Sequence, residues 1–274
     1  MRHVFTAAAI AAAAFAVAFL VLPIVALFVR IPPGELLDAL GSTAAREALL
    51  VSIKTNLIAH LAVLVVGTPA AYAIGRNRFR GRALVLSLIE LPLVLPPAAA
   101  GIALLVTFGR LGLLNGTLDA LGVRLSFTQA AVVIAVAFVE SPFYLRGAIA
   151  SFESIDDTML DAARTLGARP FHVFARVAVP LAAGGLGAAS ALALARGLGE
   201  FGATLLFAGS LQGVTQTLPL AIYAQFAVNL HTALAIGTLF VVFGAVVLLA
   251  LKVVPGWTRF VSLSTFRSAS SHST

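Results

Sequence analysis

Cysteine is absent from this chain, and charged residues, lysine above all, are scarce. Without cysteine the chain can form no disulfide, no thiolate metal site and no cysteine nucleophile, and nothing in it indicates a redox compartment. Charged residues make up only 11% of its 274 residues and hydrophobic residues 60%, whereas a soluble domain carries about 25% charged residues. The composition therefore excludes an ordinary water-soluble core and predicts an integral membrane protein.

Motifs for nucleotide binding, metal binding and catalysis are also missing. The only lysines are Lys54 and Lys252, and the chain contains no G-x-x-x-x-G-K-[S/T] phosphate-binding loop. Its five histidines are scattered without the spacing of metal ligands. No Ser/His/Asp or paired-carboxylate arrangement falls in a plausible pocket. We therefore expect no catalysis, no metal and no cofactor in this chain.

Long uncharged apolar runs predict an all-α fold. A helix needs about 20 apolar residues to cross a bilayer and a strand about 10; the runs here have helix length and lack the alternation of a barrel strand. The first run could instead be a signal peptide, although roughly 25 apolar residues is long for one. We predict a single transmembrane domain over residues 1–274 with six spans at 4–29, 49–74, 83–107, 128–145, 180–207 and 232–253.

Lys and Arg outside these spans are distributed unevenly between the two sides. One side collects twelve and the other only four, with Lys54 and Arg196 left inside spans. The positive-inside rule places the richer side, and with it both termini, in the cytoplasm. The net charge of +7 follows from this bias, so no nucleic-acid partner is needed to explain it. The four basic residues of the outer side are Arg30, Arg46, Arg110 and Arg124.

The cytoplasmic connection between the fourth and fifth spans has the pattern of a short helix. Ser154 followed by Asp157 resembles a capping box at its start, and Gly167 with Pro170 would end it. These signals predict a cytoplasmic helix of two to three turns. Residues 262–274, by contrast, are rich in Ser and small residues without an apolar period, and we expect them to be disordered.

The same segment resembles the EAA loop of bacterial ABC importer permeases, whose pattern is E-A-A, three residues, G, nine residues, I-x-L-P. Here Asp stands for Glu, and Val stands for both Ile and Leu, with every spacing kept. The resemblance implies that residues 155–175 dock on a separate ATPase; a plain solvated helix in an Ala-rich chain is the alternative. The residues implied in this coupling contact are Asp161, Ala162, Ala163, Arg164, Gly167, Arg169, Phe171 and Pro180.

Prolines and a paired charge mark two places inside the predicted spans. Pro92, Pro96 and Pro97 must break or kink the third span, and such backbone is tolerated at membrane depth only where protein buries it or water reaches it. This stretch therefore lines the transport pathway or packs in a core. In the fifth span Arg196 lies four residues before Glu200, on the same helix face. Glu200 is then either neutralised by this partner or part of the pathway.

Two stretches resemble molybdate permeases in particular. They are Gly-Glu-Phe-Gly-Ala-Thr at 199–204 and Thr-Gln-Thr-Leu-Pro-Leu-Ala-Ile-Tyr at 215–223, and sulfate permeases share the first. The resemblance covers residues 49–252, which it identifies as the permease core. Neutral donors suit the transient contacts of an oxyanion in transit, although they are also common in short external loops. The donors considered for the pathway are Thr215, Gln216 and Thr217.

Taken together, the resemblance implies a permease of an ATP-driven oxyanion importer in the bacterial plasma (inner) membrane, with molybdate as first choice and sulfate or tungstate as alternatives. Its implied partners are a cytoplasmic ABC ATPase that uses ATP and Mg, a periplasmic or lipid-anchored oxyanion-binding protein, a second copy of the chain and membrane lipid. An ion-coupled secondary transporter would need a carboxylate relay and often an internal repeat, and we find no repeat. A membrane enzyme or scaffold would need a reactive cluster at one interface, and none is visible.

Overall fold

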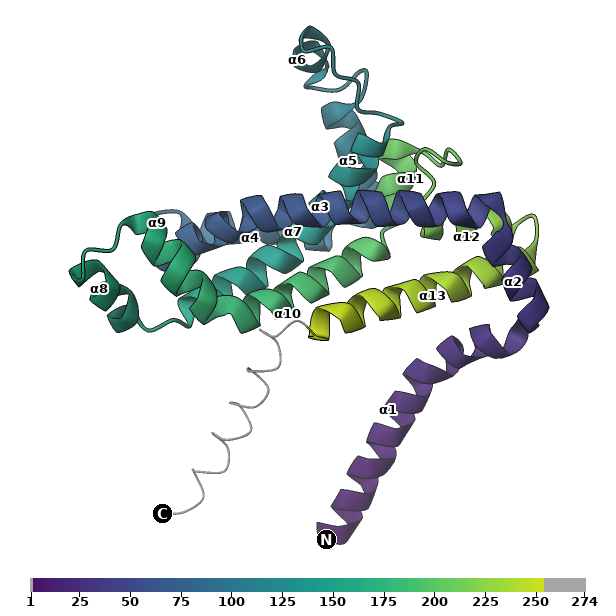
Figure 1. Cartoon of the computed structure of the whole chain (residues 1–274), viewed down its shortest axis with the longest axis horizontal. Coiled ribbons are helices and arrows are strands. Elements are labelled where there is room, and N and C mark those ends of the chain that lie inside the picture. Colours follow the sequence, from purple (N-terminus) through teal and green to yellow (C-terminus); the bar gives the residue numbers. More distant parts are fainter. Residues whose placement is uncertain (1, 254–274) are drawn as a thin grey trace.

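A bundle of long helices forms the centre of the computed structural model, which describes residues 2–253. The helices α3 (Thr43–Arg76), α7 (Gln129–Glu153), α10 (Val179–Leu198) and α13 (Leu230–Val253) run side by side (Figure 1). Every regular element within the described range is helical. Five helices have the length and hydropathy to cross a membrane, and a bent pair brings the number of candidate spans to six. The predicted all-α membrane fold is confirmed.

Small residues hold the centre of this bundle together. Alanines at the α3, α7 and α10 contacts are fully buried, Ala59, Ala148 and Ala193 among them. Small side chains let helix backbones approach closely. Close packing of this kind stabilises helix association in a membrane, where the burial of apolar side chains provides little driving force. Tyr144 and Phe152 on α7 fill the wider gaps and are buried as well.

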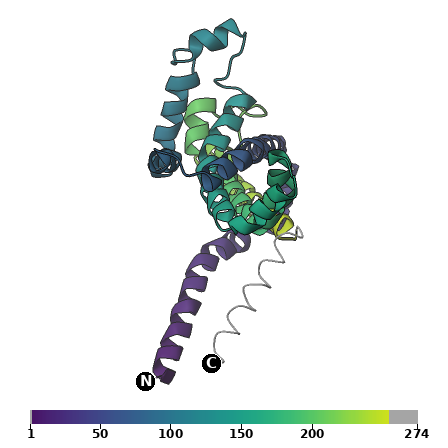
Figure 2. The same cartoon turned by 90° about the vertical axis from the view of Figure 1, so that its left-hand side faces the viewer.

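The first helix lies apart from the bundle. Helix α1 (Arg2–Arg30) extends away from the other helices in both Figure 1 and Figure 2, and the short α2 (Pro33–Gly41) joins it to α3. None of the apolar stretch of α1 is buried inside this chain. Its side chains therefore face whatever surrounds the protein.

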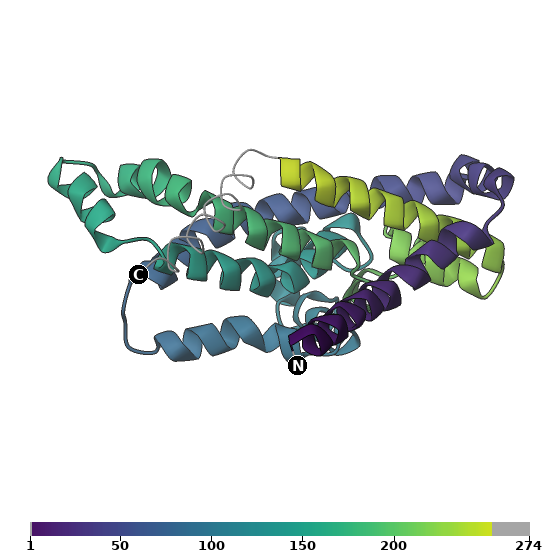
Figure 3. The same ribbon diagram turned by 90° about the horizontal axis from the view of Figure 1, so that it is seen from below.

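The third predicted span is broken where the prolines lie, as expected. Between helix α4 (Arg82–Val94) and helix α5 (Pro97–Phe108) the chain changes direction by 113°. Pro97 opens α5, where a missing N–H costs nothing. Figure 3 shows α4 running beside the bundle, whereas α5 leaves it and stands off one side in Figure 2.

The fifth predicted span, 180–207, is wrong at its end. Helix α10 stops at Leu198, and α11 (Gly202–Ala208) is a separate short helix that packs on α5. At its other end the helical run starts earlier, at Pro170, and contains a π-helical turn at Phe174–Ala178. Hydropathy cannot detect the break because apolar residues continue on both sides of it.

The remaining elements are short or extend beyond their predictions. Helix α7 continues to Glu153 rather than ending at 145, and α6 (Asn115–Ala120) and α12 (Leu218–Phe226) were not predicted. The predicted tail at 262–274 lies outside the described residues.

Candidate coupling segment and intramembrane polar site

The predicted cytoplasmic helix is present as α8 (Asp157–Thr165), at one end of the bundle (Figure 1). Its cap differs from the prediction. The carboxylate of Asp156 accepts a hydrogen bond from the backbone N–H of Thr158 at 2.9 Å, so Asp156 is the N-cap. The expected capping box from Ser154 to Asp157 is wrong, because Ser154 still belongs to the end of α7 and donates to the carbonyl of Ser151 at 2.8 Å.

The cap has an electrostatic consequence. The hydrogen bonds from Thr158, that of its backbone N–H first, lower the pKa of the Asp156 carboxyl, because they favour its charged form. The ionised carboxylate also lies at the positive end of the helix dipole. Asp156 therefore stabilises the start of α8 at neutral pH.

Gly167 ends the helix, as the sequence predicts. Its φ is +83°, in the left-handed region that glycine adopts without strain. Its N–H donates to the carbonyl of Arg164 at 2.9 Å, and the N–H of Ala168 donates to the carbonyl of Ala163 at 3.0 Å. The last carbonyls of α8 are thereby satisfied, and the chain turns into α9 (Pro170–Val173).

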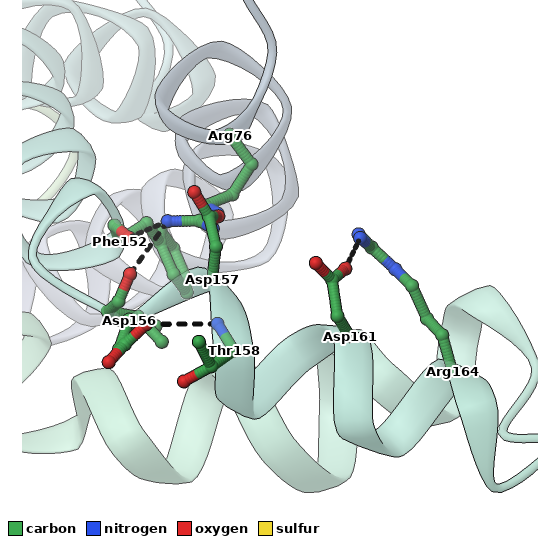
Figure 4. A network of polar contacts seen from close by, with 8 residues as sticks. Arg76, Phe152, Asp156, Asp157, Thr158, Asp161 and Arg164 are labelled. Atoms are coloured by element: carbon green, nitrogen blue, oxygen red, sulfur yellow. Dashed lines mark hydrogen bonds and ion pairs between the residues drawn. The ribbon is translucent and has the colours of Figure 1, made fainter.

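Arg76, at the end of α3, fastens this segment to the bundle (Figure 4). Its Nη1 donates to the carbonyls of Phe152 at 3.2 Å and Ile155 at 3.0 Å, and the guanidinium also forms an ion pair with Asp157. The Arg76 side chain is only 12% exposed, so these carbonyl contacts are shielded from water, whereas Asp157 is 81% exposed. The shielded carbonyl contacts fix the end of α7 and the start of the segment, and the ion pair joins Arg76 to the first residue of α8.

The outer face of the segment combines charge with exposed apolar side chains. Leu160 is fully buried and anchors α8, while Leu166 is 88% and Phe171 72% exposed. Asp161 and Arg164 form an exposed ion pair at 2.7 Å. Sequence reasoning missed Met159 and Leu166, although their apolar character in a polar helix was a signal. The predicted coupling residues exposed on the surface are Asp161, Ala162, Arg164, Gly167, Arg169, Phe171 and Pro180, and Ala163 is half-buried.

A second polar site lies inside the bundle, where three helices meet. Glu140 of α7 is fully buried, and its Oε2 is hydrogen-bonded to Nδ1 of His60 at 3.0 Å. The Nε2 of His60 is hydrogen-bonded in turn to the hydroxyl of Ser190 at 2.8 Å. This chain of contacts joins α3, α7 and α10. No sequence pattern predicts it, because Glu140 and Ser190 are 80 and 130 positions from His60.

Glu200 lies at the break between α10 and α11 and has two partners there. Its Oε2 pairs with Arg196 at 2.8 Å, as the four-residue spacing predicts. Its Oε1 accepts from the backbone N–H of Ala203 at 2.8 Å, which caps the start of α11. Both functions are structural, and a part for Glu200 in the pathway stays a prediction.

The other residues considered for the pathway fall into two places. Pro92 lies within α4, while Pro96 and Pro97 are exposed at the bend into α5. Thr215 and Thr217 are buried in the connection before α12, where the Thr215 hydroxyl accepts from the N–H of Leu211 at 2.9 Å.

Two amide side chains of that connection have partners, whereas the buried Thr217 hydroxyl has no hydrogen-bond partner within the described residues. Gln216 donates to the Ser210 hydroxyl at 3.1 Å. Gln212 donates to the Glu47 carboxylate at 3.0 Å, which ties the connection to α3. Across residues 2–253, no group of three side chains could hold a metal ion.

Comparisons with known proteins agree with this architecture. The family model of binding-protein-dependent transport system inner membrane components matches residues 64–260. The molybdenum transport system permease protein ModB of Mycobacterium tuberculosis is 42% identical over 233 residues, which are 85% of this chain and 88% of that protein. ModB of Escherichia coli K12 is 39% identical over 178 residues, 65% of this chain and 78% of that protein.

More distant relatives extend the comparison. The sulfate transport system permease protein CysW of Synechocystis is 34% identical over 218 residues, 80% of this chain and 76% of that protein. Among solved structures, a bacterial alginate ABC transporter in complex with its periplasmic protein matches with a TM-score of 0.71 at 17% identity, covering 90% of this chain and 91% of that one. This last likeness concerns the fold alone.

Proposed function

The chain belongs to the inner membrane components of binding-protein-dependent transport systems, and on this premise we propose that it is the permease subunit of a molybdate importer. Importers of this kind are ABC transporters, in which a partner ATPase uses ATP and a periplasmic binding protein takes part in the complex. The proposal assigns the transport pathway to this chain. It also places both termini in the cytoplasm, on the side that holds most of the arginines.

Sequence similarity supports molybdate as the substrate. Two relatives that are named as molybdenum permeases share 42% and 39% identity with this chain, whereas the sulfate permease shares 34%. Sulfate, molybdate and tungstate are all tetrahedral dianions, so sulfate and tungstate are the competitors to test.

Two features together support coupling through residues 155–175: α8 is fixed to the bundle, and one face of the segment is exposed. Arg76 fixes α8 to the ends of α3 and α7, and Gly167 and Asp156 fix its two ends. A partner that presses on this face therefore moves the transmembrane helices directly. Phe171 and Leu166 offer the exposed apolar side chains that an interface buries at its centre.

A second copy of the chain and lipid would cover the surfaces that this copy leaves open. None of the apolar stretch of α1 is buried, and α5, which packs mainly on α11, stands off the bundle (Figures 1 and 2). We infer a homodimer whose pathway lies between the two copies. The bend at Pro96 and Pro97 then belongs to that shared surface.

The test compares two glycines in the same backbone conformation. Gly167 and Gly81 have φ of +83° and +89°, and a Cβ at either position would meet no atom within 4 Å. Gly167→Glu should abolish molybdate uptake and co-purification of the ATPase, because it adds a charge to the proposed interface. Gly81→Glu adds the same charge and the same backbone strain outside residues 155–175 and should leave both intact.

The comparison is valid only if both variants reach the membrane at wild-type levels. Normal uptake by Gly167→Glu would refute the coupling role. Uptake that persists when the ATPase is absent would instead favour an ion-coupled secondary transporter.

A further inference from the structure

The part of the chain between α5 and α7 encloses a cavity of about 410 Å³. Its walls are the end of α5, helix α6 and residues 123–127. Helix α6 lies at the tip of the region that stands off the bundle (Figures 1 and 2). The coupling contact does not use this cavity.

Two arginines without an ionic partner line the cavity. They are Arg110 and Arg124, and none of the ion pairs formed within residues 2–253 includes either of them. The only carboxylate in the lining is Asp119, which accepts a hydrogen bond from Nδ2 of Asn115 at 3.1 Å. Two guanidinium groups against one carboxylate leave the cavity positively charged.

The charge is notable because of the side on which it lies. The sequence predicts only four Lys or Arg residues on the outer side, and two of these four share this one cavity. The chain leaves the coupling end in α4, where Arg82 pairs with Glu153, and returns to that end in α7. The connection between α5 and α7 stands off the side of the bundle, away from the coupling segment (Figure 1).

One further donor faces no partner. The hydroxyl of Ser126, also in the lining, is buried and has no hydrogen-bond partner within the described residues. A buried hydroxyl without a partner is unfavourable, and a ligand oxygen would satisfy it.

The cavity is attached to the broken helices. The ring of Phe108 in its wall lies 6.3 Å from that of Phe207 on α11. Phe127, held at a φ of +61°, packs over Gly209 at the end of α11 so closely that a Cβ there would lie 3.0 Å from its ring. A ligand in the cavity would therefore touch the residues that support α5 and α11.

We propose that this cavity is an outer binding site for the transported oxyanion, held by Arg110 and Arg124. The inference rests on the proposed function and adds a site to it. Guanidinium groups bind tetrahedral oxyanions through paired N–H donors. Since a water molecule takes up about 30 Å³, the cavity has room for the anion with part of its hydration shell. Both arginines are exposed to solvent, which weakens their hold on the anion, as release toward the pathway requires.

The experiment measures equilibrium binding of radiolabelled molybdate to the permease–ATPase complex in nanodiscs, without the binding protein. Arg110→Gln/Arg124→Gln should weaken binding about ten-fold, because two charge-assisted contacts are lost. The control, Arg30→Gln/Arg46→Gln, removes the same charge from exposed arginines outside the cavity and should change binding less than about two-fold. Molybdate uptake and capture of the binding protein are measured in parallel.

Each outcome decides the matter. Unchanged binding in the cavity variant, or an equal loss in the control, would overturn the site. A variant that binds molybdate normally but captures the binding protein poorly would also overturn it, since the cavity would then receive a carboxylate of that protein. If the Gln variant is missing from the membrane, Arg110→Lys/Arg124→Lys decides: it keeps the charge but loses the paired donors, and undiminished binding overturns the site.

The two proposals fail in different ways. A wild-type complex with no molybdate uptake would refute the proposed function itself. Uptake by the wild type without any binding that depends on the two arginines would refute this site alone.

Discussion

Replacing Gly197 with alanine should destabilise the membrane-embedded bundle. Gly197 on α10 lies against Glu140 on α7, and a Cβ there would come 2.6 Å from the Cδ and Cγ of that carboxylate side chain. Glu140 cannot swing away, because it is fully buried and its Oε2 is held by His60 at 3.0 Å. The added methyl group must therefore strain the contact between the two helices and also push the carboxylate off His60.

The size of the effect follows from three contributions. Overpacking a tight interior costs about 1–3 kcal/mol, and losing a hydrogen bond to a charged group costs about 1.5–3 kcal/mol. Replacing glycine by alanine within a helix returns about 0.5–1 kcal/mol. The net loss is about 2–5 kcal/mol, which lowers the melting temperature by on the order of 10 °C for a chain of this size.

The assay is thermal unfolding of the purified protein in lipid nanodiscs. Gly237→Ala is the control, because a Cβ at Gly237 of α13 meets no atom within 4 Å, and its melting temperature should stay the same or rise slightly. Glu140→Asp, one methylene shorter, should restore part of the loss in the Gly197→Ala background. Equal melting temperatures for Gly197→Ala and Gly237→Ala would refute the reasoning.

Three further predictions concern the polar contacts. Arg76→Ala should speed hydrogen exchange in α8 and reduce ATPase co-purification several-fold, since Arg76 fastens that helix; unaltered exchange would contradict this. Because Thr158 lowers the pKa of Asp156, the N-cap contributes fully above the ordinary pKa of 3.8 and is lost as pH falls through the lower folded value. Exchange in α8 should therefore be slower in the wild type than in Asp156→Ala from neutral pH down to about pH 4, and the difference should shrink at lower pH; equal exchange near neutrality would be evidence against the cap. His60→Ala should cost about 1–3 kcal/mol by leaving the buried Glu140 carboxyl without its hydrogen-bond partner, whereas removing both side chains should cost less than the sum of the single changes, so additive losses would argue against their coupling.

Local features of the fold and the site were accessible from the sequence. Apolar runs of membrane length are a property of contiguous residues, and so are the prolines that break the third span and the spacing of Arg196 and Glu200. Gly167 ended α8 as predicted, because a left-handed residue at a helix end is a local requirement. Even the N-cap was missed by only two positions, at Asp156 instead of Ser154.

The contacts between distant segments were not accessible. His60, Glu140 and Ser190 look like unrelated polar residues until α3, α7 and α10 pack together. Arg76 can bind the carbonyls at the end of α7 and before α8 only because α3 ends beside the end of α7.

For this protein the sequence alone determined which segments are apolar enough to cross a membrane, where the third of them breaks and which loop forms the short helix α8, because each of these depends on neighbours along the chain. Tertiary structure decided which buried polar groups are paired, what holds α8 and that Arg110 and Arg124 share one cavity. Those outcomes depend on how helices far apart in sequence approach one another. Such an approach is set by side-chain packing across the whole bundle, which no local pattern records.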